Sequence, residues 1–154
     1  MKATAILFNS RYEPKGKVNF KQLKNKMVEI HVYAIELEEG LHGFHIHQSG
    51  DLTKHCDSLC SHYNPTNSEH GGRNSSIRHV GDMGNIRANS KGIVRETFIQ
   101  SDLQLSDIIG RSIIVHKDED DLGMTNHPDS LKTENSGKRI LCGIIGIAET
   151  ECKQ

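Results

Sequence analysis

The chemistry of this sequence is carried by histidines, and their spacing predicts a metal centre. Six side chains with nitrogen or oxygen donors follow one another along the chain: His45, His47, His62, His70, His79 and Asp82. Alternate side chains of a β-strand point to one face, so His45 and His47 can both bind one ion from the same rigid strand. Six donors are more than one tetrahedral site needs, which predicts two ions. A nitrogen-rich site suits copper, and a closed set that includes a carboxylate suits zinc.

A seventh donor, His116, ends the apolar run 112–115. This run is typical of a strand, and its last residue could meet His45 and His47 from a neighbouring position. These histidines would together form the copper ligands.

Short runs with a period of two predict the strands that position these donors. Such alternation is seen within 18–20, 28–34, 86–88 and 94–98. The turn residues Asn89–Gly92 suit a hairpin between two of these runs. The best helical candidate is the short piece Pro128–Lys132. These patterns indicate an all-β fold.

Two long segments, Gln48–Met83 and Lys117–Lys138, show no alternation and are rich in Gly, Asn, Ser, Asp and His. Loops of this length in a compact domain are usually functional or disordered. Because the first contains His62, His70 and His79, we expect it to be functional and to fold around something that orders it.

Length and charge limit the remaining possibilities. A chain of 154 residues predicts one domain, spanning residues 1–154. The formal net charge of −1 gives no whole-chain signal for nucleic acid or an anionic membrane. No stretch has the length of a membrane span, and the first apolar run, Ala3–Phe8, is too short for a signal-peptide core. We therefore expect a cytoplasmic protein with no nucleic-acid or membrane partner.

Four segments resemble the signature sequences of copper/zinc superoxide dismutases. They are Gly43-Phe44-His45-Ile46-His47, His70-Gly71-Gly72, His79-Val80-Gly81-Asp82 and Gly143-Ile144-Ile145-Gly146-Ile147-Ala148. The resemblance runs in order to Ala148. It implies an eight-stranded Greek-key β-barrel or sandwich with two functional loops, one holding zinc and the disulfide and the other guiding the anion by charge.

The resemblance also implies a role for each donor. Copper would be held by His45, His47, His62 and His116. Zinc would be held by His62, His70, His79 and Asp82. His62 would bridge the two ions, and Asp120 would hydrogen-bond one ligand histidine of each ion, His45 and His70. Arg139 would stand beside copper, and Lys132 and Thr133 would line the substrate channel.

The reaction implied is the dismutation of superoxide to oxygen and hydrogen peroxide, a function in antioxidant defence. Copper would alternate between two oxidation states, and zinc would hold the loop and tune the bridge. His62 would carry a proton to the product, and Arg139 would attract and orient the anion.

The resemblance pairs Cys56 with Cys142 in a disulfide, leaving Cys60 and Cys152 as thiols. Four cysteines allow three complete pairings, so exchange remains an alternative. Closing so long a loop stabilises the fold by roughly 4 to 5 kcal/mol in the chain-entropy model.

Plainer interpretations compete at several positions. His31, His55 and His127 are expected at the surface, and His42 is expected to make structural hydrogen bonds. Asp120 lies among other acidic residues, so a solvated turn is the alternative to its metal-orienting role. Cys56, Cys60, His62 and His70 could form a small zinc finger, but the spacing is poor and other donors stay unused. In the second loop, Pro128 and Asp129 stand where many relatives have two acidic residues, which would alter the field that guides the anion.

Three functions are open. The first is an active dismutase, a homodimer with Ile109-Gly110 and Ile147 near its two-fold interface, that receives copper from a delivery protein. The second is a copper and zinc buffer or a delivery protein, although delivery proteins carry an additional Cys-x-x-Cys domain that this sequence lacks. The third is an inactive homologue, which should have lost a copper ligand or the arginine, and here His116 and Arg139 are both present.

Overall fold

The fold consists almost entirely of antiparallel strands. A computed structural model describes residues 1–132 and 136–148 of the chain. Its strands are β1 (Lys2–Phe8), β2 (Pro14–Gln22), β3 (Val28–Ala34), β4 (Gly40–His47), β5 (Asp82–Ala88), β6 (Val94–Gln100), β7 (Ser112–His116), β8 (Arg139–Ile144) and β9 (Gly146–Ala148). Two single turns of helix accompany them, η1 (His55–Ser58) and α1 (Leu105–Ile108). None of the described helices is long and apolar enough to cross a membrane.

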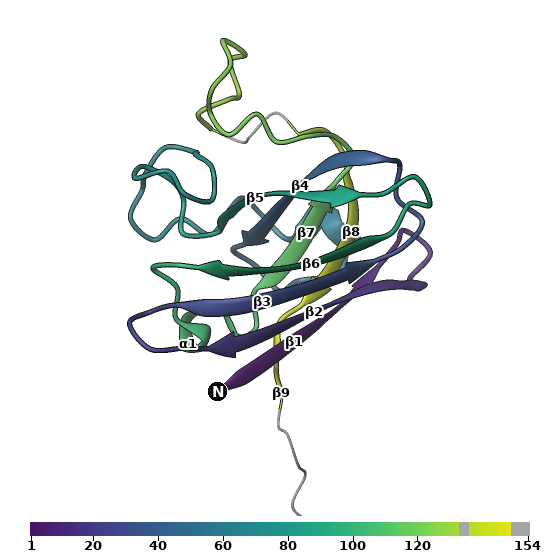
Figure 1. Cartoon of the computed structure of the whole chain (residues 1–154), viewed down its shortest axis with the longest axis horizontal. Coiled ribbons are helices and arrows are strands. Elements are labelled where there is room, and N and C mark those ends of the chain that lie inside the picture. Colours follow the sequence, from purple (N-terminus) through teal and green to yellow (C-terminus); the bar gives the residue numbers. More distant parts are fainter. Residues whose placement is uncertain (133–135, 149–154) are drawn as a thin grey trace, which may run out of the picture.

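Eight strands form one curved sheet in the order β5-β4-β7-β8-β1-β2-β3-β6 (Figure 1). The ninth strand, β9, continues β8 after Ile145 and pairs with β1. Gly143 lets β8 approach β1 closely, because a side chain there would collide with the carbonyl oxygen of Ile6. The prediction of an all-β, eight-stranded barrel is confirmed.

The barrel is not fully closed between β5 and β6. Asn89–Gly92 forms the predicted turn between them, but these strands are the two ends of the sheet and do not form the predicted hairpin ladder. Arg73 occupies the seam. Its guanidinium donates to the carbonyl oxygens of Met83 (2.9 Å) and Asn85 (3.1 Å) on β5 and lies 3.6 Å from the centre of the Phe98 ring on β6. These carbonyls therefore bind a side chain instead of the neighbouring strand.

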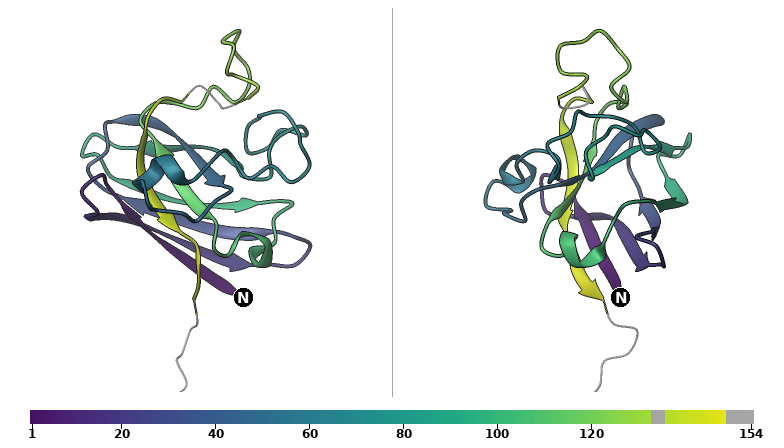
Figure 2. Two further views of the ribbon diagram at one scale, coloured as in Figure 1. Left: turned by 180° about the vertical axis from the view of Figure 1, so that it is seen from behind. Right: turned by 90° about the vertical axis from the view of Figure 1, so that its left-hand side faces the viewer.

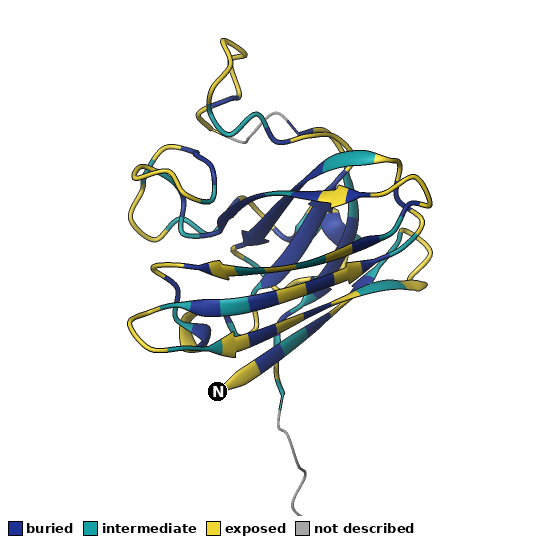
Figure 3. Ribbon diagram, viewed as in Figure 1, coloured by how far each residue is buried: buried dark blue, intermediate teal, exposed yellow. Residues whose placement is uncertain are grey.

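Burial follows the strand period where one face meets water. In β3, buried and accessible residues alternate, whereas all five residues of β7 and the last six of β4 are buried (Figure 3). The inner face of β4 and β7 contributes Phe44, Ile46, Ile113 and Val115 to the core. Their outer face is buried because the long loops cover it.

The two long loops contact each other and β4. The amide of His70 donates to the carbonyl of Leu131 (2.8 Å), and the amide of Gly43 on β4 donates to the carbonyl of Asp118 (2.9 Å). In Figure 1 the teal part of the first loop lies beside the start of β5 and the green second loop rises above it, and Figure 2 shows the same arrangement from two other sides.

The predicted helix at Pro128–Lys132 is wrong. The segment forms successive turns, with hydrogen bonds from Ser130 N to His127 O and from Lys132 N to Asp129 O, each 3.0 Å. A stretch this short gains too few helical hydrogen bonds to offset the cost of nucleation.

Candidate metal centre

Strands β4 and β7 present the first histidines on the outer face of the barrel. The two strands pair antiparallel with Phe44 opposite Val115 and His45 opposite Ile114. Since Phe44 and Val115 point into the core, the alternate residues His45, His47 and His116 point outward. The sequence predicted that His45 and His47 share a face, and the register places His116 beside them.

The first long loop adds His62 to this group. His62 forms an isolated β-bridge with His47, supported by the hydrogen bond from Tyr63 N to Ile46 O (2.8 Å). The candidate ligand atoms of His45, His47, His62 and His116 all lie within 4.8 Å of one another, and all four residues are buried. The structure thus brings together the four predicted copper ligands.

Hydrogen bonds select which nitrogen of each ring faces the centre. A carbonyl oxygen can only accept, so Nδ1 of His47 donates to Cys60 O (2.9 Å) and Nδ1 of His116 donates to Gly137 O (3.1 Å). In both rings Nε2 is left with a lone pair. The buried Nε2 of His47 has no hydrogen-bond partner. A lone pair held without a donor fits a metal ion, and imidazole nitrogens suit copper.

The second cluster has the spacing of ligands around one ion. Nδ1 of His62 lies 3.0 Å from Nδ1 of His79 and 2.9 Å from Oδ1 of Asp82. His79 Nδ1 lies 3.2 Å from the same oxygen, and His70 Nδ1 lies 3.0 Å from Oδ2 of Asp82. Tetrahedral zinc with bonds of about 2.0 Å places its ligands roughly 3.3 Å apart. This fully buried set, three nitrogens and a carboxylate, fits zinc.

Asp120 connects the two clusters. It is only 1% exposed, which excludes a solvated acidic turn. Its Oδ2 accepts from His45 Nε2 and its Oδ1 from His70 Nε2, each at 2.7 Å, so Nδ1 of both rings faces its cluster. The Asn85 side chain fixes the Asp120 backbone through bonds of 3.0 Å and 2.7 Å. Sequence reasoning missed Asn85, because a lone asparagine on a strand carries no signal for this role.

Burial and charge set the protonation of three of these groups. Burial, followed by the nearby His62, His45 and Arg139, lowers the pKa of His47 well below its usual value. For His70 burial acts in the opposite direction to the hydrogen bonds from Asp120 and Asp82, but those bonds prevail and raise its pKa to about 10. Burial would raise the pKa of Asp82, yet hydrogen bonds with His62, His70 and His79 lower it overall.

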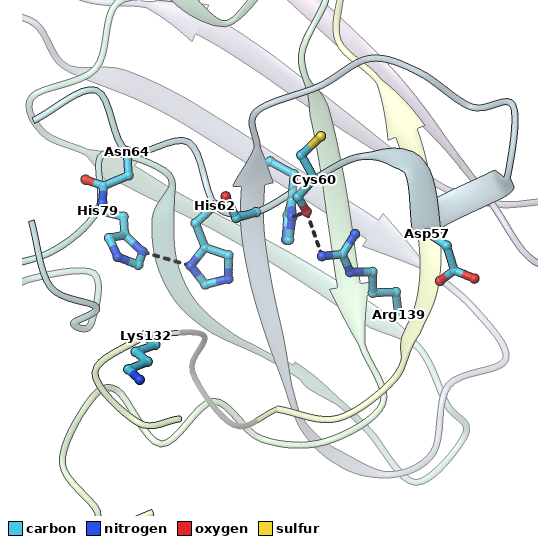
Figure 4. Close-up of a pocket in the computed structure, with 9 residues that line it drawn as sticks. Asp57, Cys60, His62, Asn64, His79, Lys132 and Arg139 are labelled. Atoms are coloured by element: carbon cyan, nitrogen blue, oxygen red, sulfur yellow. Dashed lines mark hydrogen bonds between the residues drawn. The ribbon is translucent and has the colours of Figure 1, made fainter. Parts of the chain in front are cut away.

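A small pocket of about 270 Å³ opens onto the first cluster (Figure 4). Its lining comprises His47, Asp57, Cys60, Ser61, His62, Asn64, His79, Lys132 and Arg139. The Arg139 guanidinium is held by the carbonyl oxygens of Cys56 (2.9 Å) and Cys60 (2.6 Å). Two cations, Lys132 and Arg139, next to the cluster histidines suit a small anion. Lys132, predicted to line the substrate channel, lines this pocket, and the other predicted channel residue, Thr133, is outside the described residues.

Comparison with known proteins agrees with this geometry. Residues 14–145 match the family described as copper/zinc superoxide dismutase (SODC). The chain belongs to the copper/zinc superoxide dismutase family.

Individual relatives cover most of the chain. The extracellular superoxide dismutase [Cu-Zn] of Drosophila melanogaster is 50% identical over 86% of this chain and 76% of its own length. The copper chaperone for superoxide dismutase of Rattus norvegicus is also 50% identical, over 84% of this chain but only 47% of its own length. A crystal structure of the clock protein EA4 matches with a TM-score of 0.90 and 38% identity, covering 96% of this chain and 94% of that one.

The disulfide implied by the resemblance to dismutases is present. Cys56, in η1, is bonded to Cys142 on β8, with the Cα atoms 5.7 Å apart. It joins the first long loop to the strand that begins at Arg139, so it also fixes the carbonyls that hold this arginine. Cys60 is an exposed free thiol. Cys152 is outside the described residues.

The remaining histidines divide between surface and structural roles. His31 and His127 are exposed, as predicted. His42 is buried, with its ring nitrogens 2.7 Å from Glu38 O and 2.8 Å from His116 O, the structural role expected of it. His55 was predicted to be a solvated surface residue, and this prediction is wrong. Its ring is half-buried against the disulfide.

Proposed function

We propose that the protein is a copper/zinc superoxide dismutase that converts two superoxide anions and two protons to oxygen and hydrogen peroxide. The single observation that carries this proposal is the pair of buried clusters that share His62, one with four histidines and one with three histidines and Asp82. Family membership and relatives named as dismutases support it.

The first cluster would hold copper and the second zinc. When bound, copper supplies the one-electron redox chemistry, and zinc is redox-inert and structural. The protein contributes fixed ligands, since each ring is oriented by a carbonyl, a carboxylate or its neighbours.

His62 would serve as the bridge and the proton carrier. Its Nδ1 belongs to the zinc cluster, 2.9 Å from Asp82, and its ring stacks on His45 with a centroid separation of 4.2 Å. With Nδ1 in the zinc cluster, Nε2 of His62 would hold a proton when it does not bind copper, and it would deliver that proton to the reduced substrate in the pocket.

Arg139 would orient the anion. Two carbonyl oxygens fix its guanidinium at the wall of the pocket that His47 and His62 also line. Lys132 adds positive charge across the pocket (Figure 4). A pocket of about 270 Å³ admits a diatomic anion and water.

His116→Ala tests the function. The variant should lose superoxide turnover while retaining zinc and the fold, because His116 belongs to the copper cluster alone. The matched control is His31→Ala, an exposed histidine on β3 that should remain fully active. An active His116→Ala protein contradicts the copper assignment.

A copper-delivery role is the second candidate, because copper chaperones are among the relatives. It predicts copper transfer to a separate acceptor without fast turnover. Turnover and transfer measured on the same metal-loaded sample separate the two functions. We favour the enzyme because the pocket places Arg139 and Lys132 next to the cluster histidines.

We also propose a homodimer that works in the cytoplasm and receives copper from a delivery protein. Ile147 on β9 is 59% exposed, and Gly110 N donates to Ile145 O (2.8 Å), so both predicted contact segments lie together. Sedimentation tests the dimer: the parent protein should sediment as a dimer and Ile147→Glu as a monomer. A monomeric parent protein would contradict the proposed dimer. Secretion of the intact chain by its own cells would contradict the cytoplasmic assignment.

A further inference from the structure

A third group of potential ligands lies at the disulfide, outside the site described above. His55 Nε2 lies 3.5 Å from Cys142 Sγ and 3.7 Å from Cys56 Sγ. The three donor atoms all lie within 4.8 Å of one another.

The backbone and a neighbouring ring hold His55 in this position. His55 begins η1 with a φ of 52°, in the left-handed region, where histidine is more common than most residues. The Tyr12 ring meets the His55 ring edge-on, with centroids 5.1 Å apart. The imidazole is therefore directed at the sulfurs by a defined local conformation.

The nitrogen–sulfur distances already match those of two ligands on one ion. For metal–nitrogen bonds of about 2.05 Å and metal–sulfur bonds of about 2.3 Å, the angles of about 120° in a three-ligand site give a separation of roughly 3.8 Å, within about 0.3 Å of both distances. In the disulfide form the two sulfurs are bonded to each other and cannot both bind a metal. Reduction breaks that bond, and only the sulfurs must then move apart.

The surroundings favour a soft ion. Cys56 is 2% exposed and Cys142 is fully buried, and both pack with Leu59 and Ile114 in a small apolar cluster. Soft thiolate ligands select Cu(I) or zinc. Zinc in structural sites takes four ligands, and the described residues supply three here.

We propose that reduction of the disulfide converts His55, Cys56 and Cys142 into a second copper site, which binds Cu(I) through one imidazole nitrogen and two thiolates. In the reduction a thiol or phosphine reductant gives two electrons to the sulfur–sulfur bond, and the two thiolates formed are the ligands. In the oxidised form His55 Nε2 also lies 3.3 Å from Phe8 O. Copper would replace this hydrogen bond, and the ring proton would reside on Nδ1. The copper site and the disulfide therefore exclude each other.

Cu(I) titration of the reduced and oxidised protein tests the proposal. The sample is first loaded with zinc and with one copper per chain at the two histidine clusters. It carries the substitutions Cys60→Ser and Cys152→Ser, which remove the other two thiols. After anaerobic phosphine reduction, Cu(I) is added against a chromophoric Cu(I) chelator. We expect one additional Cu(I) per chain in the reduced protein and none in the oxidised protein, with copper–sulfur scattering in X-ray absorption. This readout does not depend on superoxide turnover.

The decisive variant is His55→Asn, since asparagine tolerates the same backbone conformation but lacks the imidazole. It should weaken the additional site at least tenfold while zinc content stays unchanged. The matched control, His31→Asn, should bind as the parent does. The proposal is overturned by an additional copper in the oxidised protein, by none in the reduced protein, by unchanged affinity in His55→Asn, or by zinc in place of Cu(I).

Discussion

At the level of single residues, the hydrogen bond made by one nitrogen of an imidazole determines which nitrogen faces the metal cluster. Backbone carbonyls of Cys60 and Gly137 bind Nδ1 of His47 and His116, and Asp120 binds Nε2 of His45 and His70. Each ring is thereby held in one orientation, with its other nitrogen toward a cluster. The protein's own hydrogen bonds therefore orient these four rings.

Asp120→Asn should therefore weaken both metals. The amide keeps the shape but cannot accept from His45 and His70 as strongly as a carboxylate does. We expect metal affinity to fall roughly 10- to 100-fold, measured by competition with chelators. Asp121→Asn, on the neighbouring acidic residue, is the control and should bind as the parent does. Unchanged affinities in Asp120→Asn would show that the hydrogen bonds do not support the ligands.

Arg139→Ala should lower kcat/KM for superoxide roughly tenfold and flatten its dependence on salt, since steering by charge is screened by ions. Copper and zinc content should not change, because Arg139 belongs to neither cluster. Arg11→Ala, at an exposed arginine remote from the pocket lining, is the control. If Arg139→Ala keeps the parent rate at low salt, the arginine does not guide the anion.

At the level of elements, the centre depends on β4 and β7 being neighbours and on a loop covering them. Pairing of the two strands brings His116 to the His45 and His47 pair, and the disulfide anchors the loop that carries His62 to β8. Cys56 and Cys142 are separated by 86 residues, so the bond restricts a large part of the unfolded chain.

Replacing Cys56 and Cys142 together by serine should destabilise the fold by about 2 to 5 kcal/mol. Activity should fall in the same variant, because the loop carbonyls that hold Arg139 lose their anchor. Denaturant unfolding and turnover measure the two effects, with Cys60→Ser as the control. Equal stability of the double variant and the parent would show that packing alone holds the loop.

The strands and most of the candidate ligands could be predicted from sequence, because neighbouring residues along the chain carry the pattern that indicates them. The period of two predicted the strands, and the two-residue spacing of His45 and His47 predicted a shared face. Burial of Asp120 was left open, because neighbouring acidic residues resemble a solvated turn and only the tertiary contacts with His45 and His70 decide.

The errors also come from tertiary contacts. His55 is ordinary in sequence, and only the packing of η1 on β8 brings it to the disulfide. The turn at 89–92 predicted a hairpin, but the side chain of Arg73, from the loop that precedes β5, binds the β5 carbonyls. The helix prediction at 128–132 failed for a local reason, because a segment this short forms too few helical hydrogen bonds to offset the cost of nucleation.

For the whole molecule, the free energy of unfolding depends on the protonation of His70 and Asp82 and on zinc binding. The raised pKa of His70 stabilises the metal-free fold fully below pH 6.5, its ordinary value, and this contribution is lost as pH rises through about 10. The lowered pKa of Asp82 stabilises the fold above its ordinary 3.8 and is lost in acid. Zinc must displace the proton of His70.

Zinc should consequently stabilise the protein more as pH increases. Between about pH 5 and 8 we expect zinc affinity to rise about tenfold per pH unit for the proton displaced from His70. The gap in Tm between zinc-loaded and metal-free protein should widen over the same range, measured by calorimetry. A gap that is constant with pH would contradict proton displacement.

The most direct test of the account is copper and zinc content per chain, with superoxide turnover on the same purified sample. The two clusters predict one copper and one zinc, with fast turnover that cyanide inhibits. Zinc without copper, and no turnover after copper is restored, would contradict the account and favour a structural or metal-handling homologue.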